Sequence, residues 1–297
     1  MTVELSTPDV ADLGGVIRAL RDWQDEASPT QLHPGDLGWF WRHGSEAVAA
    51  ALRTWSRDGH LLAIGFLDGP DVLRMTVAPH VWREDELANR VAADASEPQR
   101  GVLPAGKVSV ETPDGTRARE ALFDAGWGAG AAYTPLRRDL TAPVEDPGLR
   151  IEVVRSGQES EFTAVHRSAW GSPRFTDELW CQMTTGLPYP DARCLLGFGP
   201  HGVAVAGATV WSAGPGKPGL LEPVGVHAEH RGHGYGRMIS VAAAAELQKL
   251  GSSSAEVVAR SANTAAVATY KSAGFQQLPE RLDRSRDNRR TPGTPRR

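Results

Sequence analysis

The chain has 297 residues, a formal net charge of −4 and 40% hydrophobic residues, which is the balance of a globular protein. No apolar run is long enough to span a membrane and the N-terminus lacks a signal-peptide pattern, so we expect a cytoplasmic protein without membrane partners. The two cysteines, Cys181 and Cys194, have neither metal-binding nor redox spacing, and we expect both to be reduced.

The two halves of the chain share landmarks. Three features recur at an offset of 148 or 149 residues: an opening strand (3–5 and 151–153), a strand end (Val77 and Val226) and a glycine–aromatic pair (126–127 and 274–275). A constant offset predicts two copies of one domain rather than a single larger fold. We place the first copy at 1–140, a linker at 141–149, the second copy at 150–280 and a basic flexible tail at 281–297.

The first copy has charges where the second has glycines. After Val77, residues 80–86 hold three carboxylates and no glycine. Carboxylates repel a bound phosphate, so we expect the first copy to be degenerate, to hold no cofactor, and to shape the structure or the substrate site. Binding of two cofactor equivalents per chain would contradict this expectation.

The second copy predicts alternating strands and helices. Gly171 and Pro173 interrupt the first helical stretch, so two helices are expected there. The expected elements are a strand at 151–154, helices at 159–169 and 176–185, a hairpin of strands at 194–197 and 203–211, a strand at 220–226, a helix at 235–250 and a strand at 255–261. This order predicts a mixed α/β layer.

The loop between the strand at 220–226 and the helix after it predicts an anion site. It carries glycines at 232, 234 and 236, and an Ala-rich helix follows directly. Backbone N–H groups at a helix N-terminus bind anions, and Arg231 adds a positive charge. A G-x-G-x-x-G dinucleotide motif fails because Arg237 occupies its third glycine position, and the Gly-Lys-Ser/Thr of a P-loop is absent.

Two motifs carry a resemblance to a known family. Arg231, Gly234 and Gly236 form R-x-x-G-x-G, which resembles the coenzyme A loop of the GNAT acetyltransferase superfamily. The segment from Asn263 to Phe275 fills every named position of that superfamily's N-x-x-A-x-x-x-Y-x-x-x-G-F pattern. The resemblance implies an α/β fold of two tandem GNAT-like domains, each a mixed, mostly antiparallel sheet flanked by helices. A degenerate copy before an intact one resembles the mycothiol synthase-like tandem proteins of actinobacteria.

The resemblance implies acetyl-CoA as co-substrate. Pro223 and Gly225 weaken a strand, and in GNAT proteins this strand splays from its neighbour to admit the pantetheine arm. The first copy has Gly115 and Leu122 at the offsets of Asn263 and Tyr270. The expected cofactor-binding residues are Val224, Gly225, Val226, Arg231, Gly232, His233, Gly234, Tyr235, Gly236, Arg237 and Asn263.

The implied reaction needs a base and an acid. An ammonium must lose a proton before its nitrogen attacks, and Glu222 is the first candidate for the base, with His227 as a minor alternative. Glu222 shares strand parity with Val224 and Val226, so these side chains are expected on one face. Tyr270 is the expected acid for the departing thiolate, and the N–H of Val226 is placed to stabilise the oxyanion.

The sequence indicates less about the acceptor of the acetyl group than about its donor. We expect an N-acetyltransferase acting on a primary amine of a small molecule by direct attack, with Ala169 to Ser172 on the acceptor side. An acidic body favours a cationic acceptor. The aromatic residues 39–41 are expected to pack in the core, with a cap over the cleft as the alternative. The alternatives are a protein or peptide N-acetyltransferase and a non-catalytic acetyl-CoA sensor. The first half carries no substrate motif, and the oligomeric state is left open between monomer and homodimer.

Two further patterns predict no additional partner. His227, His230 and His233 recur every third residue, but a segment that turns from strand to loop does not converge ligands, so no metal is expected. Residues 281–297 hold seven arginines and two aspartates, without any nucleic-acid motif, so no nucleic-acid partner is expected.

Overall fold

The computed structural model describes residues 2–287. The first copy comprises β1 (Glu4–Ser6), α1 (Leu13–Asp22), α2 (Pro34–Phe40), α3 (Ser45–Ala51), β2 (Leu52–Arg57), β3 (His60–Leu67), β4 (Val72–Val77), α4 (Asp85–Ser96), β5 (Lys107–Glu111), α5 (Arg117–Asp124) and β6 (Gly128–Asp139). The second comprises β7 (Arg150–Val153), α6 (Glu159–Trp170), α7 (Asp177–Thr184), β8 (Ala192–Phe198), β9 (Ala204–Ser212), β10 (Gly219–Val226), α8 (Tyr235–Lys249), β11 (Ser254–Arg260), α9 (Thr264–Ser272), β12 (Gln276–Gln277) and β13 (Arg281–Asp287).

The repeat predicted from the sequence is present in the structure. Each copy runs through an opening strand, helices, a meander of strands, and two helices separated by a strand. Val77 and Val226 both end strands, and Gly126 and Gly274 both have positive φ just after a helix. The helix caps refine one expectation, because Thr116 caps α5 as Asn263 caps α9, so Thr116 rather than Gly115 is the structural counterpart of Asn263.

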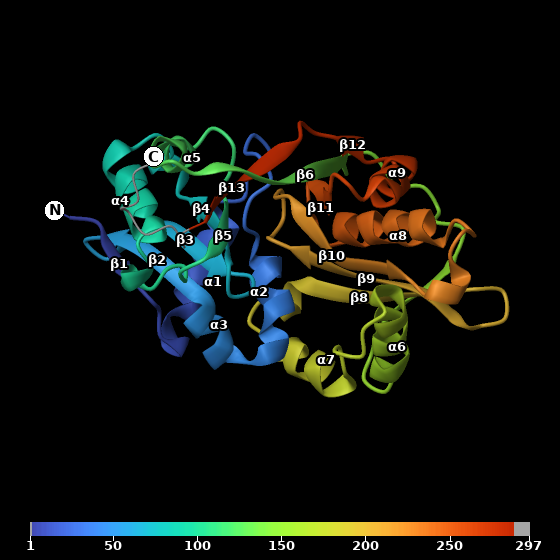
Figure 1. Cartoon of the computed structure of the whole chain (residues 1–297). Helices are drawn as coiled ribbons and strands as arrows, with labels where there is room; N and C mark the ends of the chain where they lie inside the picture. The colour runs from blue at the N-terminus through green and yellow to red at the C-terminus, as the bar shows by residue number, and fades with distance from the viewer. Residues whose placement is uncertain (1, 288–297) are drawn as a thin grey trace, which may run out of the picture.

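One sheet runs through both copies in the order β1-β2-β3-β4-β5-β13-β6-β11-β10-β9-β8-β7. Most of its neighbouring strands are antiparallel, while β4 pairs with β5 and β10 with β11 in parallel. In the second copy, α8 packs on one face of the sheet, and α6 and α7 cover the opposite face (Figure 1). The first copy has its own separate core, built around Trp55, Leu20 and Val91.

The copies exchange their last strands. Strand β6 of the first copy pairs with β11 of the second from Tyr133 to Asp139, and β13 of the second copy lies between β5 and β6 (Figure 1). The expectation of a flexible tail from residue 281 is therefore wrong for 281–287. The Arg281 side chain is buried and donates to the Thr30 carbonyl. The rest of the predicted tail, 288–297, lies outside the described residues.

Local chemistry explains the element boundaries of the second copy. Thr176 caps α7, its hydroxyl accepting from the Leu179 N–H, so this helix begins one residue later than expected. Helix α6 ends at Gly171, whose positive φ of 57° suits a residue without a side chain. These two ends leave a turn between α6 and α7, as the sequence predicted.

Candidate active site

The strand β10 separates from β11 soon after its first residues. The two strands pair only at Gly219 and Leu220, whereas β10 stays paired with β9 to its end at Val226. A bulge between Leu221 and Val224 adds one residue to β10, and the Glu222–Pro223 peptide is cis. The sequence signal of a proline and a glycine within a strand therefore marks a gap in the sheet.

Backbone polar groups point into this gap. The His227 N–H donates to the Val205 carbonyl of the β9 side, and hydrogen-bonded pairs alternate along an antiparallel ladder. The N–H and C=O groups of Val224 and Val226 consequently face away from β9, toward β11. They are free to bond an extended ligand lying between the strands.

The bulge also corrects one expectation. Leu221 and Val224 pack in the same cluster against α8, although three positions separate them along the strand. The extra residue reverses the alternation of side chains, so Glu222 does not share a face with Val224 and Val226. The Glu222 side chain instead contacts Asp36 of the first copy.

The glycine loop begins α8 with an open N-terminus. Gly232 and Gly234 have φ of 83° and 79°, a region that side-chain-bearing residues rarely adopt. A Cβ on Gly236 would lie 3.0 Å from Thr269 on α9, so this glycine allows the two helices to approach. The Arg231 guanidinium donates to the Ala169 carbonyl at 2.6 Å, which ties the loop to the end of α6.

A cavity of about 1140 Å³ connects the gap, the loop and the space between the copies. Its second-copy lining follows β10, the glycine loop, β11 and α9, and its first-copy lining comes from α2 and the ends of β3, β4 and β5. Of the residues expected to bind cofactor or to catalyse, all but His233 line this cavity. The His233 ring instead faces the His230 and Arg231 carbonyls.

Glu222 stands where the two copies meet. It is half-buried, since it lines the cavity while protein surrounds it on the other sides. Burial is the main cause that raises the pKa of Glu222 to about 8, and Asp36 and Asp68 of the first copy raise it further. Arg74 acts in the opposite direction and lowers this pKa. A carboxyl group with such a pKa is matched to proton exchange near neutral pH.

Tyr270 lies on α9 across the gap from Glu222. Burial, and then the charge of Glu222, raise the pKa of the Tyr270 hydroxyl above its ordinary value. A raised pKa keeps this phenol protonated at neutral pH, so it is available as a proton donor. Its ring packs edge-on against Phe275, with centroids 5.9 Å apart.

Charged residues of the first copy form the floor of the cavity, and sequence reasoning missed them. Arg74 on β4 approaches Asp36 at 2.8 Å and both Asp68 and Glu111 at 3.4 Å. Arg281 of the exchanged strand β13 contacts Glu111 at 2.7 Å. One signal was available: Arg74 is the single charged residue of β4, an otherwise largely apolar strand, and its partner position on β5 is the acidic Glu111.

An aromatic wall faces this floor. Trp170 stacks on His166 with centroids 4.2 Å apart, and Trp39 of the first copy lies 5.3 Å from the same imidazole. Burial lowers the pKa of His166 to about 4, so this ring is neutral. Trp170 lines the cavity, as expected for the end of α6. Trp41 is a core residue, as expected for residues 39–41, whereas Trp39 lines the cavity.

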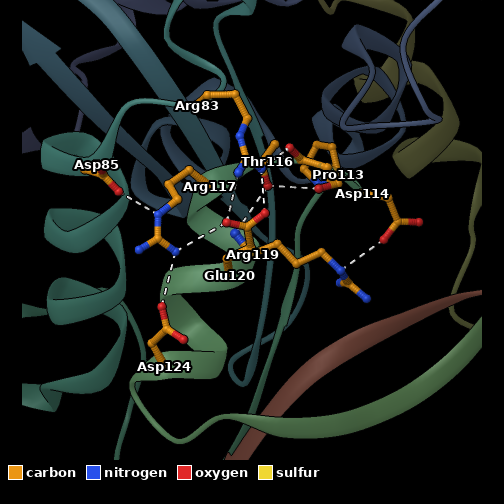
Figure 2. Close-up of polar contacts among 10 residues, drawn as sticks. Arg83, Asp85, Pro113, Asp114, Thr116, Arg117, Arg119, Glu120 and Asp124 are labelled. Carbon is orange, nitrogen blue, oxygen red and sulfur yellow. Dashed lines mark hydrogen bonds and ion pairs between the residues drawn. The ribbon is translucent and has the colours of Figure 1, made fainter.

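The corresponding place in the first copy is filled by ion pairs (Figure 2). Arg117 at the start of α5 contacts Asp85 at 2.6 Å and Asp124 at 3.2 Å, and Arg83 pairs with Glu120. Asp85 and Glu86 occupy the first turn of α4, where a phosphate would otherwise bind. Carboxylates at this position repel a phosphate, and the absence of a cofactor from the first copy stays a prediction.

The three loop histidines do not converge. The rings of His227 and His230 lie 5.3 Å apart, and His227 Nδ1 accepts from the Glu229 N–H. Within residues 2–287, no group of three or more histidine, cysteine or acidic side chains is arranged to hold a metal ion. In the same residues, no helix combines the length and apolar character that crossing a membrane requires.

A split parallel strand pair, a glycine-rich helix N-terminus and a cavity that joins them are the features expected of an acyltransferase with a thioester donor. Comparison with known proteins agrees. Residues 156–275 match the sequence model of the acetyltransferase (GNAT) family. Together with the acetyltransferase relative described next, this match identifies the chain as an acyltransferase.

Two kinds of relatives extend this comparison over the chain. A mycothiol acetyltransferase of Thermobispora bispora is 27% identical, over 72% of this chain and 84% of that protein. A tandem GNAT protein of the clavulanic acid biosynthesis pathway superposes with a TM-score of 0.62 at 16% identity, over 97% and 99% of the two chains. A GCN5-related N-acetyltransferase of Sphaerobacter thermophilus gives a TM-score of 0.59 at 20% identity, over 96% and 95%. These structures share the tandem fold.

Proposed function

We propose that this protein is an N-acetyltransferase that moves the acetyl group of acetyl-CoA to a primary amine of a small cationic molecule. The observation that carries the proposal is the gap between β10 and β11. It joins a helix N-terminus suited to an anion with a half-buried carboxyl group of raised pKa. The GNAT family uses acetyl-CoA, which makes this thioester the expected donor.

The donor half of the site divides into two parts. The pyrophosphate binds the N–H groups at the start of α8 together with Arg231 and Arg237, while the pantetheine arm extends along Val224 to Val226. The Arg231 guanidinium has donors beyond the one that the Ala169 carbonyl accepts, and these are available to the pyrophosphate. Asn263 holds the first turn of α9 through its bond to the Ala266 N–H, and this keeps Tyr270 at the thioester.

The transfer follows from the positions of these groups. The carboxylate at Glu222 takes a proton from the substrate ammonium, and the free amine attacks the thioester carbonyl. The Val226 N–H faces the gap and donates to the oxyanion that forms there. As the C–S bond breaks, Tyr270 gives its proton to the thiolate, and the second proton lost by nitrogen restores Tyr270. No covalent acyl-enzyme is required.

The acceptor half favours a small cation over a polypeptide. Its floor carries Asp36, Asp68 and Glu111, which the guanidiniums of Arg74 and Arg281 only partly neutralise. An ammonium is attracted to such a surface, and the aromatic wall offers it apolar and cation–π contacts. The cavity lies between the copies and is partly open to solvent, so the charged floor rather than enclosure supports a compact cationic acceptor.

The test is thiol release from acetyl-CoA in the presence of a panel of small amines, aminoglycosides and peptides. Tyr270→Phe is expected to lower turnover far more than acetyl-CoA affinity, because the hydroxyl acts on the leaving thiolate. Tyr189→Phe is the matched control, because Tyr189 does not line the cavity. Transfer to peptides alone would replace the small-molecule proposal. Tight acetyl-CoA binding without transfer to any amine would favour the sensor.

A further inference from the structure

Asp36 is the most deeply buried carboxylate of the cavity floor. Its side chain is 1% exposed, and its Oδ2 accepts from the His33 N–H at 2.6 Å, which fixes the carboxylate at the start of α2. The other oxygen, Oδ1, meets Arg74 in an ion pair at 2.8 Å and has no hydrogen bond. A buried carboxylate oxygen without a hydrogen bond indicates that a donor is missing from this arrangement.

The Glu222 carboxyl is the group that Asp36 contacts from the second copy. Helix α2 packs against β9 and β10, and Gly35 and Gly38 permit this approach, because a Cβ at either would lie within 2.5 Å of Trp211. Two carboxyl groups in hydrogen-bond contact cannot both be ionised without strong repulsion, so such a pair retains one proton. The retained proton supplies the donor that Asp36 lacks.

The surrounding charges do not remove this repulsion. Arg74 divides its charge among Asp36, Asp68 and Glu111, while Arg281 serves Glu111. Three further groups act on the pair: Asp68 from the end of β3, the Arg42 guanidinium following α2, and the Tyr270 hydroxyl from α9. Burial raises the pKa of Asp36 as well, although Arg74 opposes it.

We propose that Asp36 of the first copy and Glu222 of the second share one proton and work as a single unit, with Asp36 as the residue that positions and tunes the base. The inference rests on the proposed transfer of acetyl to an amine. It gives the first copy a direct part in the chemistry of the second.

The proton balance of the pair follows the reaction. Approach of the substrate ammonium favours the doubly ionised pair, which releases its shared proton to solvent. The pair then takes one proton from the ammonium, returns to its singly protonated state, and leaves a neutral amine beside the thioester. The second nitrogen proton leaves after attack and replaces the one that Tyr270 gives to the thiolate. One proton per turnover reaches solvent.

The pH dependence of kcat/KM tests the pair, with the best acceptor found in the amine panel. Asp36→Asn keeps an oxygen for the His33 N–H but removes one charge from the pair. Loss of a like charge lowers the pKa of Glu222, so the acidic limb of the profile should move down by about one pH unit or more. Asp36→Glu retains the carboxyl group and should keep the limb near the wild-type position.

Asp68→Asn is the matched control, because the Asp68 side chain is 50% exposed and solvent screens its charge. The acidic limb of the Asp68→Asn profile should move by clearly less than that of Asp36→Asn. The proposal of a shared proton would be wrong if the acidic limb of the kcat/KM profile stayed in place in folded Asp36→Asn. It would also be wrong if Asp68→Asn moved the limb equally. Should Asp36→Asn fail to fold, Asp36→Ser takes its place, since a hydroxyl can accept from the same N–H. Absence of acetyl transfer by the wild type would instead contradict the proposed function.

Discussion

Replacing Glu222 with glutamine is the most direct test of the proposed base. The amide preserves shape and polarity but cannot take a proton from the substrate. A positioned general base contributes about 10²- to 10⁴-fold to a rate, and we expect kcat to fall within that range. Acetyl-CoA binding should be nearly unchanged, because Glu222 is not among the groups proposed to hold the pyrophosphate or the pantetheine arm.

The structure also gives the shape of the wild-type profile. The pKa of Glu222 lies at about 8, so only about one-tenth of the enzyme carries the ionised base at pH 7. This fraction rises to about nine-tenths at pH 9, so kcat/KM should increase roughly tenfold between these values. The sign follows from burial, which disfavours the carboxylate and delays its ionisation to higher pH.

The assay is thiol release measured from pH 6 to 10 with one acceptor. The amine itself also ionises over this range, and the glutamine variant separates the two effects, since any remaining limb in that variant belongs to the substrate. A limb near pH 8 that persists unchanged in Glu222→Gln would refute the assignment. A Glu222→Gln rate close to wild type would refute it as well.

Three further changes test the gap, the contact between the copies and the exchanged strand. Gly225→Ala places a Cβ 2.5 Å from Trp170, so acetyl transfer should fall as the α6 end is displaced; thiol release measures this. Gly38→Ala places a Cβ 2.3 Å from Trp211, and thermal melting should show a loss of about 1–3 kcal/mol. Burial raises the pKa of Asp283 to about 6, so its contribution to stability declines as pH rises from about 4 to 6. Asp283→Asn should therefore raise the melting temperature more at pH 8 than at pH 5.

Each of these three predictions has a control variant or a result that would contradict it. Gly14→Ala lies in α1, where the added Cβ would meet only the flexible end of Arg18 at 3.7 Å, so it should be neutral or slightly stabilising. Equal melting temperatures for Gly14→Ala and Gly38→Ala would contradict the packing argument. Undiminished turnover of Gly225→Ala would show that the α6 end can move freely. A melting difference for Asp283→Asn that is the same at both pH values would exclude the linkage.

The sequence predicted the second copy well because its boundaries are set by local chemistry. Thr176 and Asn263 cap helices through their own side chains, and the glycine loop imposes positive φ whatever surrounds it. Such signals act over a few residues and are legible without tertiary information. The bulge at Glu222 was predictable only in part. Pro223 indicates an irregular strand, but it does not indicate how the irregularity changes the direction of the neighbouring side chains.

The acceptor side and the exchanged strand were not predictable in the same way. Residues 281–287 are rich in arginine and resemble a solvated tail, yet Arg281 is buried because Glu111 and the Thr30 carbonyl receive it. No motif in the sequence distinguishes Asp36 from any other acidic residue in the first turn of a helix. Its role depends on a strand from the other half of the chain, and no local pattern records that proximity.

Because the two copies exchange strands, each copy depends on the other for one strand of its part of the sheet. Residues 141–149 are the connector between β6 and β7, but a cut there removes no strand from the sheet. Each fragment would still donate its final strand to the other, through β6 beside β11 and β13 beside β5. Two separately expressed fragments should thus assemble by mutual complementation, whereas either alone would present an unfilled strand position to solvent.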